Sequence, residues 1–129
     1  MKAALIAGLP LLSLFAATCS SSDDPGRHYE RGLALSNERR WDEALAEFDR
    51  AVGLDVDDAA ARAARGAVLV HLGRYREAQA DLDAAITLDP NSTDAYAYRI
   101  TVDMVLNDLD QAFHDLKCFR RLSQPASIP

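Results

Sequence analysis

The sequence predicts an all-α fold of three stacked helical hairpins, and three observations carry this prediction. The segment 25–58 recurs without a gap as 59–92, and a weaker third copy occupies 93–126. Within the first copy, Ala44, Phe48 and Ala51 form one apolar stripe at helical spacing. A repeat period of 34 residues is typical of stacked units that bury a continuous core between neighbours.

The first two copies share eleven identical positions, which is the strongest internal signal. The first member of each pair is Arg31, Gly32, Leu35, Arg40, Glu43, Ala44, Ala46, Asp49, Ala51, Leu54 or Asp55. The third copy keeps fewer of the matching residues, namely Arg99, Ala112, Asp115, Leu116 and Leu122.

Each copy is expected to hold two helices joined by a short turn. In chain order the six helices are predicted near 26–38, 41–54, 59–72, 75–88, 93–106 and 109–122. Pro25 suits a first helical turn with Asp24 as its cap, and Asp57 and Asp58 can cap the third helix. Pro90 ends the fourth helix because the residue before a proline is pushed out of the helical region.

This pattern resembles the tetratricopeptide repeat, in which each unit is a pair of antiparallel helices. Residues typical of the family occupy equivalent positions in the copies. Gly32 and Gly66 stand where the two helices approach closely, Gly73 stands at the turn, and Trp41, Tyr75 and Leu109 follow the turn. The position for a small residue holds Ala44, Ala78 and Ala112, the position for a large residue holds Phe48, Leu82 and Leu116, and Asp89-Pro90-Asn91 ends the second unit. The resemblance implies a right-handed α-solenoid of three helix-turn-helix units over 25–126, with 127–129 as a tail.

The third copy departs from the pattern. Ile100 replaces the close-approach glycine, and Asp103 stands where the other copies have a leucine. We expect water to reach Asp103, because a terminal unit has no neighbour to seal it. The segment that follows the third copy's second helix does not predict a capping helix, and Phe119 replaces the alanine of the other copies. Phe119 is therefore a partial cap, or the open end docks on a second copy or another protein.

The segment 1–18 predicts a secretory signal. Lys2 is the only charged side chain before Asp23, and Ala3–Thr18 is uncharged and mostly apolar. As a helix, this apolar stretch would span about 24 Å, which is short of the roughly 30 Å hydrocarbon core of a bilayer. A charged start, a short apolar stretch and small residues at its end indicate export and removal.

Cys19 is the candidate lipidation site. "AATC" resembles the lipobox of bacterial lipoproteins, although Ala16 stands where leucine is commonest and Thr18 where Gly, Ala or Ser is expected. The segment 19–24 would form a polar tether. The resemblance implies a cell-envelope protein anchored to a membrane through lipid on Cys19, and Ser20 in the next position favours the outer membrane if the source has one. The alternatives are a cleaved soluble periplasmic or secreted protein, and a cytosolic scaffold with an uncleaved start.

Composition excludes several classes of partner. The net charge is −6, and without Lys2 the chain has 13 basic and 20 acidic residues, a net charge of −7. This balance argues against nucleic acid and gives no attraction to anionic lipids. No nucleophile elbow or phosphate loop is present, so we predict no enzyme and no cofactor.

Two further clusters are candidate sites. His114 and Cys118 are one helical turn apart on one predicted helix, which supplies two metal ligands but no third. Cys118 is otherwise an inert thiol or a bridge to Cys118 of a second copy. Glu47, Asp81 and Asp115 recur at the same position of each copy, which predicts a negative stripe on the outer face, either solvated or a docking strip for a basic partner.

The resemblance implies a concave groove lined by the first helix of each unit. The corresponding groove residues are Tyr29, Leu33, Ser36, Ala63, Ala67, Val70, Asp94, Ala97 and Thr101, with Met104 beyond them. Such a mildly apolar channel suits a peptide segment or a helix of another protein. Members that grip a peptide's terminal carboxylate use Lys, Asn and Arg in the groove, whereas the matching positions here hold Tyr29, Leu33, Ala64, Asp94 and Tyr98. The prediction is therefore a non-enzymatic adaptor or scaffold without the carboxylate grip.

Overall fold

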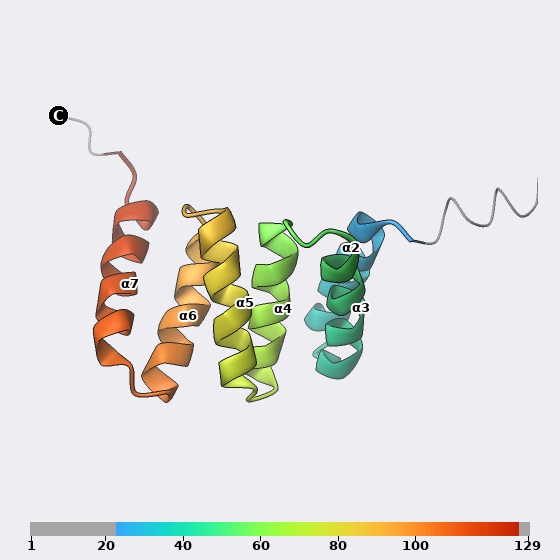
Figure 1. Ribbon diagram of the computed structural model, residues 1–129, viewed down its shortest axis with the longest axis horizontal. Helices are drawn as coiled ribbons and strands as arrows, with labels where there is room; N and C mark the ends of the chain where they lie inside the picture. Colours follow the sequence, from blue (N-terminus) through green and yellow to red (C-terminus); the bar gives the residue numbers. More distant parts are fainter. Residues whose placement is uncertain (1–22, 127–129) are drawn as a thin grey trace, which may run out of the picture.

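The computed structural model describes residues 23–126, which form six α-helices in one row (Figure 1). They are α2 (Pro25–Asn37), α3 (Trp41–Leu54), α4 (Ala59–His71), α5 (Tyr75–Leu88), α6 (Thr93–Val105) and α7 (Leu109–Ser123). The predicted bounds agree closely with these. The predicted signal over 1–18, Cys19 with most of its tether, and the tail 127–129 lie outside the described residues.

The turn inside each hairpin has the same backbone geometry three times. Arg39, Gly73 and Asn107 occupy equivalent positions and have φ angles of 60°, 76° and 64°. The next amide in each turn donates to the carbonyl oxygen of Leu35, Leu69 or Asp103, at 2.9, 2.9 and 2.8 Å. This left-handed ending is free of strain at glycine and costs roughly 1–2 kcal/mol at a residue such as Arg39.

Polar caps start the first helix of every hairpin. The side chain of Asp24 accepts a hydrogen bond from the Gly26 amide at 3.1 Å, and Asp58 accepts one from the Ala61 amide at 3.1 Å. The hydroxyl oxygen of Ser92 accepts from the backbone of the third unit in the same way. The predicted caps Asp24 and Asp58 are therefore confirmed, and each satisfies an amide that has no partner inside its helix.

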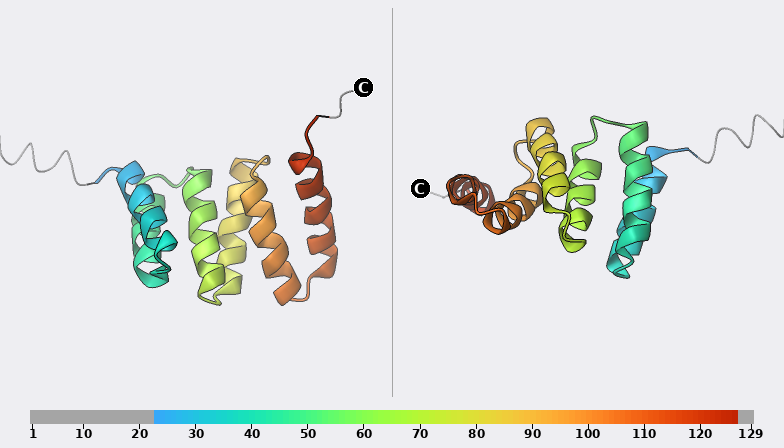
Figure 2. Two further views of the ribbon diagram at one scale, coloured as in Figure 1. Left: turned by 180° about the vertical axis from the view of Figure 1, so that it is seen from behind. Right: turned by 60° about the horizontal axis from the view of Figure 1, so that its bottom comes forward.

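The helices form two layers, with α2, α4 and α6 in one and α3, α5 and α7 in the other (Figure 2). Helix α4 contacts both α2 and α6, whereas no second helix of a described hairpin contacts another second helix. The row therefore curves, and the first helices lie on its inner side. This is an all-α helical-repeat solenoid, as the sequence predicts.

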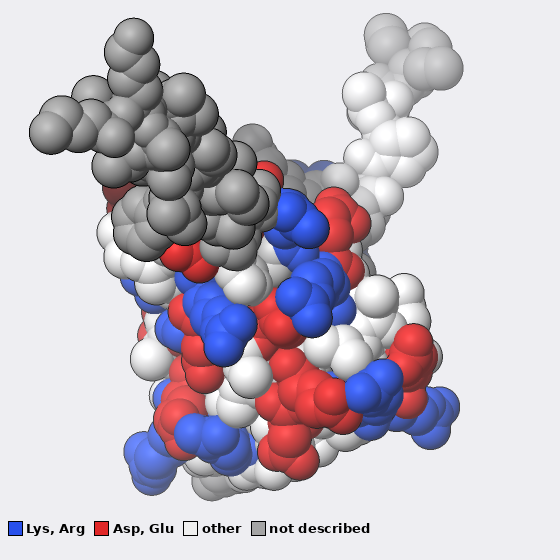
Figure 3. Space-filling view, turned by 90° about the vertical axis from the view of Figure 1, so that its right-hand side faces the viewer, with Lys and Arg blue, Asp and Glu red and all other residues white. Residues whose placement is uncertain are grey.

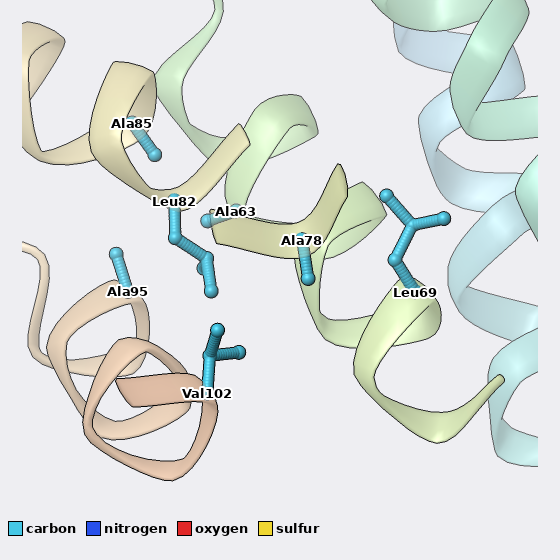
Figure 4. Close-up of a cluster of buried hydrophobic side chains, with 7 residues drawn as sticks. All are labelled: Ala63, Leu69, Ala78, Leu82, Ala85, Ala95 and Val102. Atoms are coloured by element: carbon cyan, nitrogen blue, oxygen red, sulfur yellow. The ribbon is translucent and has the colours of Figure 1, made fainter. Parts of the chain in front are cut away.

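Apolar side chains of adjacent layers form the core. In the larger cluster, Leu82 of α5 and Val102 of α6 point toward one another and are fully buried (Figure 4). The equivalent pair one unit earlier is Phe48 of α3 with Val68 of α4. Burying one such side chain contributes about 1.5–3 kcal/mol relative to exposure. The same contact thus joins each unit to the next.

Glycine allows the two helices of a hairpin to approach closely. A Cβ placed on Gly32 would lie 2.6 Å from Cε1 of Phe48, and one on Gly66 would lie 2.9 Å from Cγ of Leu82. Both distances are below van der Waals contact. By contrast, a Cβ on Gly53, inside α3, would meet nothing within 4 Å.

A recurring arginine links each hairpin to the preceding one. Arg99 of α6 donates from Nε and Nη2 to the two oxygens of Asp115 in α7, at 2.5 and 2.6 Å. Its Nη1 donates to Asp83 of α5 at 2.8 Å. One guanidinium therefore holds three helices, with one bidentate partner in its own hairpin.

The same arrangement occurs one unit earlier. Arg65 donates from Nε and Nη2 to Asp81, at 2.6 and 2.7 Å, and from Nη1 to Asp49 at 3.1 Å. The first unit differs, because Glu47 pairs mainly with His28 Nδ1 at 2.6 Å, while Arg31 lies 3.7 Å away. The hydrogen bond from His28 holds the pKa of Glu47 below its ordinary value. We call these contacts of Arg65 and Arg99 the arginine ladder.

The expected acidic stripe on the outer face is wrong. Asp81 and Asp115 are 5% and 0% exposed, and Glu47 is largely covered, so neither a solvated face nor a docking strip is available. The cause is a basic residue that precedes each acid at a constant spacing in the sequence. That spacing places the two charges opposite one another across a hairpin.

The expectation that water reaches Asp103 is also wrong. Its side chain is fully buried, and Oδ1 accepts a hydrogen bond from Nε2 of Gln79 in α5 at 3.1 Å. Oδ2 has no hydrogen-bond partner among the described residues. The terminal unit is sealed at this position because the Gln79 amide takes the place that water was expected to fill.

Burial also changes the acidity of Asp103. It raises the pKa of this carboxyl above its ordinary value, and the nearby Asp115 raises it further. The folded chain therefore holds the proton more firmly than the unfolded chain does. As pH rises from the ordinary pKa through the raised one, the contribution of Asp103 to stability falls.

Substitution of Gly66 tests the close approach of the helices. Gly66→Ala is expected to destabilise the fold by about 1–3 kcal/mol, because the new methyl group overlaps Leu82 and overpacks the hairpin. The matched control Gly53→Ala is expected to be neutral or to stabilise by up to about 1 kcal/mol, since it gains helix propensity without a clash. Urea unfolding followed by circular dichroism measures both, and equal effects would contradict the packing argument.

The arginine ladder predicts unequal costs for two identical substitutions. Asp115→Asn removes the buried partner of Arg99 and is expected to cost about 3 kcal/mol. Asp83→Asn removes the other partner, whose side chain is 55% exposed, and is expected to cost less than about 1 kcal/mol. Unfolding free energies of the two variants provide the comparison. A loss at Asp83 as large as that at Asp115 would show that burial does not decide the ladder's contribution.

Candidate functional site

The inner side of the solenoid carries a cleft of about 390 Å³. Its walls come from α2, α4, two residues of α3, the first half of α6 and the turn before α6. The lining residues are Tyr29, Leu33, Ser36, Asn37, Trp41, Phe48, Ala59, Ala60, Ala63, Ala64, Ala67, Val68, His71, Asp89, Ser92, Asp94 and Tyr98. All three hairpins therefore contribute to one cavity.

Three rings from three different hairpins form a row in the cleft. The Trp41 and His71 rings are stacked, with centroids 4.1 Å apart and an interplanar angle of 6°. Tyr98 meets His71 edge-on, at 6.3 Å and 71°. Aromatic surfaces of this kind bind apolar and cationic side chains.

Alanines of α4 keep the cleft open along its middle wall. Ala60, Ala63, Ala64 and Ala67 all line the cavity. Each methyl group occupies little space, so an incoming chain can approach the helix backbone. Larger residues in this wall would fill the cavity.

The charge of the cleft has one sign. Asp89 and Asp94 line it, and no Lys or Arg is among the lining residues. The pKa of Tyr29 is raised, first by burial and then by the carboxylates of Asp58, Glu30 and Asp94. An anion entering the cleft would therefore meet repulsion, whereas a cation would be attracted.

Ser36 supplies an unused hydrogen-bonding group in the wall. Its Oγ is buried and makes no hydrogen bond to any described residue. Buried polar atoms normally have a partner. Because Oγ is not exposed to the cleft, a bound chain would reach it only after the side chain changes rotamer.

The structure brings six of the nine predicted groove residues into the cleft. These are Tyr29, Leu33, Ser36, Ala63, Ala67 and Asp94. Val70 packs instead against the larger core cluster. Thr101 is exposed and donates its hydroxyl to the carbonyl of Ala97 at 3.2 Å, and neither residue lines the cleft. The cavity thus ends before the last turns of α6.

Trp41 and His71 are cleft residues that the sequence prediction misses. The repeat pattern assigns Trp41 to the position after the turn, and the three histidines share no repeat position. One signal in the sequence points to His71, which occupies the repeat position of Asn37, next to Ser36 of the groove face. That both rings line the cavity depends on the packing of α3 against α4.

His114 and Cys118 form no larger cluster. The Sγ of Cys118 lies 3.9 Å from Nε2 of His114. No group of three His, Cys, Asp or Glu side chains within residues 23–126 is placed to hold a metal ion. Over the same part of the chain, no helix has the length and apolar character needed to cross a bilayer.

Comparison with known families and structures gives the following similarities. The second hairpin, residues 59–92, matches the family model described as tetratricopeptide repeat. No curated protein matches the chain. Many solved structures do match.

Three of the solved structures illustrate the likeness. The second tetratricopeptide-repeat domain of Spaghetti (RPAP3), bound to the HSP90 peptide SRMEEVD, is 26% identical, with a TM-score of 0.75 over 77% of this chain and 92% of that one. The TPR2B domain in the pHsp70 complex of yeast Sti1 is 25% identical, with a TM-score of 0.74 over 78% and 81%. The Arabidopsis OM64 domain is 23% identical, with a TM-score of 0.74 over 77% and 82%, and shows likeness of fold alone. The repeat match and these neighbours together support a tetratricopeptide-repeat protein.

Proposed function

We propose that this chain is a non-enzymatic protein-interaction module that holds one extended segment or helix of another protein in its cleft. The observation that carries the proposal is the cleft itself, which combines a row of rings, a wall of alanines and two carboxylates. Two similar structures are complexes, one with an HSP90 peptide and one with pHsp70, which supports a binding role for a groove of this kind. Three hairpins give a short groove, which suits one modest segment.

The cleft's charge defines which segment fits. The peptide SRMEEVD of the RPAP3 structure is acidic at its end. Here the five positions expected to grip such an end, Tyr29, Leu33, Ala64, Asp94 and Tyr98, all line the cleft, and none is cationic. The fitting segment instead carries apolar side chains for the rings and Lys or Arg beside Asp94 and Asp89. Cation–π contact with Trp41 adds to this preference.

Designed peptides test this preference. A short labelled peptide that alternates Leu with Lys is expected to bind more tightly than the same peptide with Glu, and SRMEEVD is expected not to bind. Asp94→Lys should weaken the Leu–Lys peptide by about threefold to tenfold, because one attractive pair becomes repulsive. Fluorescence anisotropy at low and high salt measures these affinities.

Asp42→Lys is the matched control. Like Asp94, Asp42 is an exposed acid in the first turn of a helix, but it does not line the cleft. Both substitutions change the net charge and the helix start equally. An equal loss of affinity in the two variants would show that overall charge, rather than the cleft, selects the peptide.

We further propose that the protein is exported and held at a membrane of the cell envelope by lipid on Cys19. The support is the sequence alone: a charged start, an apolar stretch, and a cysteine after two small residues. The tether from Cys19 to Pro25, the start of α2, spans no more than about 20 Å even when fully extended. The cleft would then work close to the bilayer.

Metabolic labelling tests the anchor. Cells grown with a palmitate analogue are expected to label the wild-type chain and not the Cys19→Ala variant, because the thiol is the acceptor. Cys118→Ala is the control, since Cys118 lies on α7 and its loss is expected to leave labelling unchanged. No label on the wild-type chain would exclude lipidation while leaving the cleft's function untouched.

A further inference from the structure

Helix α7 carries a continuous apolar stripe on the side that faces away from the rest of the row. Leu109, Phe113 and Leu116 are 49%, 63% and 42% exposed, although all three are large and apolar. Their spacing places them on one side of the helix. Helix α7 is the last in the row, and no described helix lies beyond it (Figure 1).

The equivalent faces of α3 and α5 are covered. Phe48 and Leu82 occupy the position of Leu116, and they are 1% and 0% exposed. In each case the first helix of the next unit supplies the cover, through Val68 or Val102. The α7 stripe is therefore the kind of surface that this fold buries against another helix.

The opposite end of the row does not offer a matching cover. Arg27 of α2 stands where α4 and α6 have Ala61 and Ala95, which pack on the preceding hairpin. Acidic and basic side chains are mixed over the visible part of this end (Figure 3). Stacking α2 of one copy on α7 of another would place the long Arg27 side chain against Phe119, at a position where α4 and α6 have only a methyl group, and would overpack the contact. Head-to-tail growth is thus disfavoured.

The charges beside the stripe favour antiparallel pairing of α7 with itself. Asp110 lies in the first turn, and Lys117 and Arg121 follow it after about two and three turns, on the same side of the helix. In an antiparallel pair, this side of one helix faces the same side of the other with the direction reversed. Asp110 then lies opposite Lys117 and Arg121 of the second copy, at both ends of the contact. In a parallel pair, this side of one helix would face the opposite side of the other, so these charges would not meet.

We propose that two copies of this chain associate through α7, antiparallel and about a two-fold axis, with Phe113 of each copy against Leu116 of the other. Near each end, the aliphatic stem of Arg120 covers Leu109 of the second copy. The interface is self-complementary and closes at two copies. A contact between single helices lies at the small end of specific interfaces, so the dimer is weak, with a dissociation constant on the order of 10 µM.

Sedimentation equilibrium of the full chain in a mild, density-matched detergent tests the proposal. The wild-type chain is expected to pass from monomer to dimer as its concentration rises to about 100 µM, the range set by that dissociation constant. Phe113→Glu should raise the dissociation constant about tenfold or more, because it places a charge in the centre of the contact. Val56→Glu is the matched control, since Val56 is also exposed and apolar at 55% but lies between α3 and α4.

Charge exchange tests the orientation. Asp110→Lys and the double variant Lys117→Glu/Arg121→Glu are each expected to weaken self-association by about threefold to tenfold, since like charges then face one another. Mixing the two variants should restore wild-type affinity, because every pair across the mixed dimer is then of opposite sign.

Three results would overturn the proposal. A wild-type chain that stays monomeric over this range excludes the dimer. Equal weakening by Phe113→Glu and Val56→Glu places the contact elsewhere than α7. A mixture of the two charge variants that associates no better than each alone excludes the antiparallel arrangement.

Discussion

The arginine ladder is the electrostatic constraint on which the hairpins of this solenoid depend. Apolar contacts between units, such as Leu82 with Val102, supply much of the stabilisation and join each hairpin to the next. Arg65 and Arg99 each make a bidentate contact within their own hairpin and a further contact with the hairpin before. The bidentate partners Asp81 and Asp115 are buried, so separating the two helices of a hairpin would leave a buried carboxylate without its cation, which costs several kcal/mol. The contacts between hairpins end on Asp49 and Asp83, which are more than half exposed, and these contacts contribute much less. The ladder therefore fixes how the two helices of each hairpin pack, and the apolar contacts between hairpins align the inner helices that form the cleft.

Much of the fold could be predicted from the sequence because its determinants are local. The repeat period, the caps Asp24 and Asp58, and the turn at Gly73 each depend on a few neighbouring residues, and the helix bounds follow. The acidic stripe is different, because Asp81 and Asp115 recur with the period and so do their partners Arg65 and Arg99. Each set taken alone is consistent with an exposed stripe. The ion pairs can be predicted only when the sequence spacing between each arginine and its aspartate is compared with the geometry of a hairpin.

The cleft could be predicted only in part, because a repeat pattern gives equivalent positions and not the differences between units. Periodicity places Tyr29 on the inner face, but the hollow part of that face depends on the stacked rings of Trp41 and His71, which come from other helices. Asp103 shows the same limit at a single residue. It replaces a leucine, and Gln79, which is its partner, stands where the first unit has Leu45. Two substitutions in different units thus compensate one another.

The positions of the cleft and of the α7 stripe make two binding surfaces compatible. No residue of α7 lines the cleft, whose lining ends at Tyr98 in α6. Pairing through α7 therefore leaves the cleft of each copy accessible, and a two-fold axis places the two clefts on equivalent sides of the dimer. A partner with two copies of the recognised segment would then engage both, and the second contact would form at a high effective concentration. Weak binding in one short cleft is thereby consistent with firm retention of such a partner, provided that its two segments span the distance between the clefts.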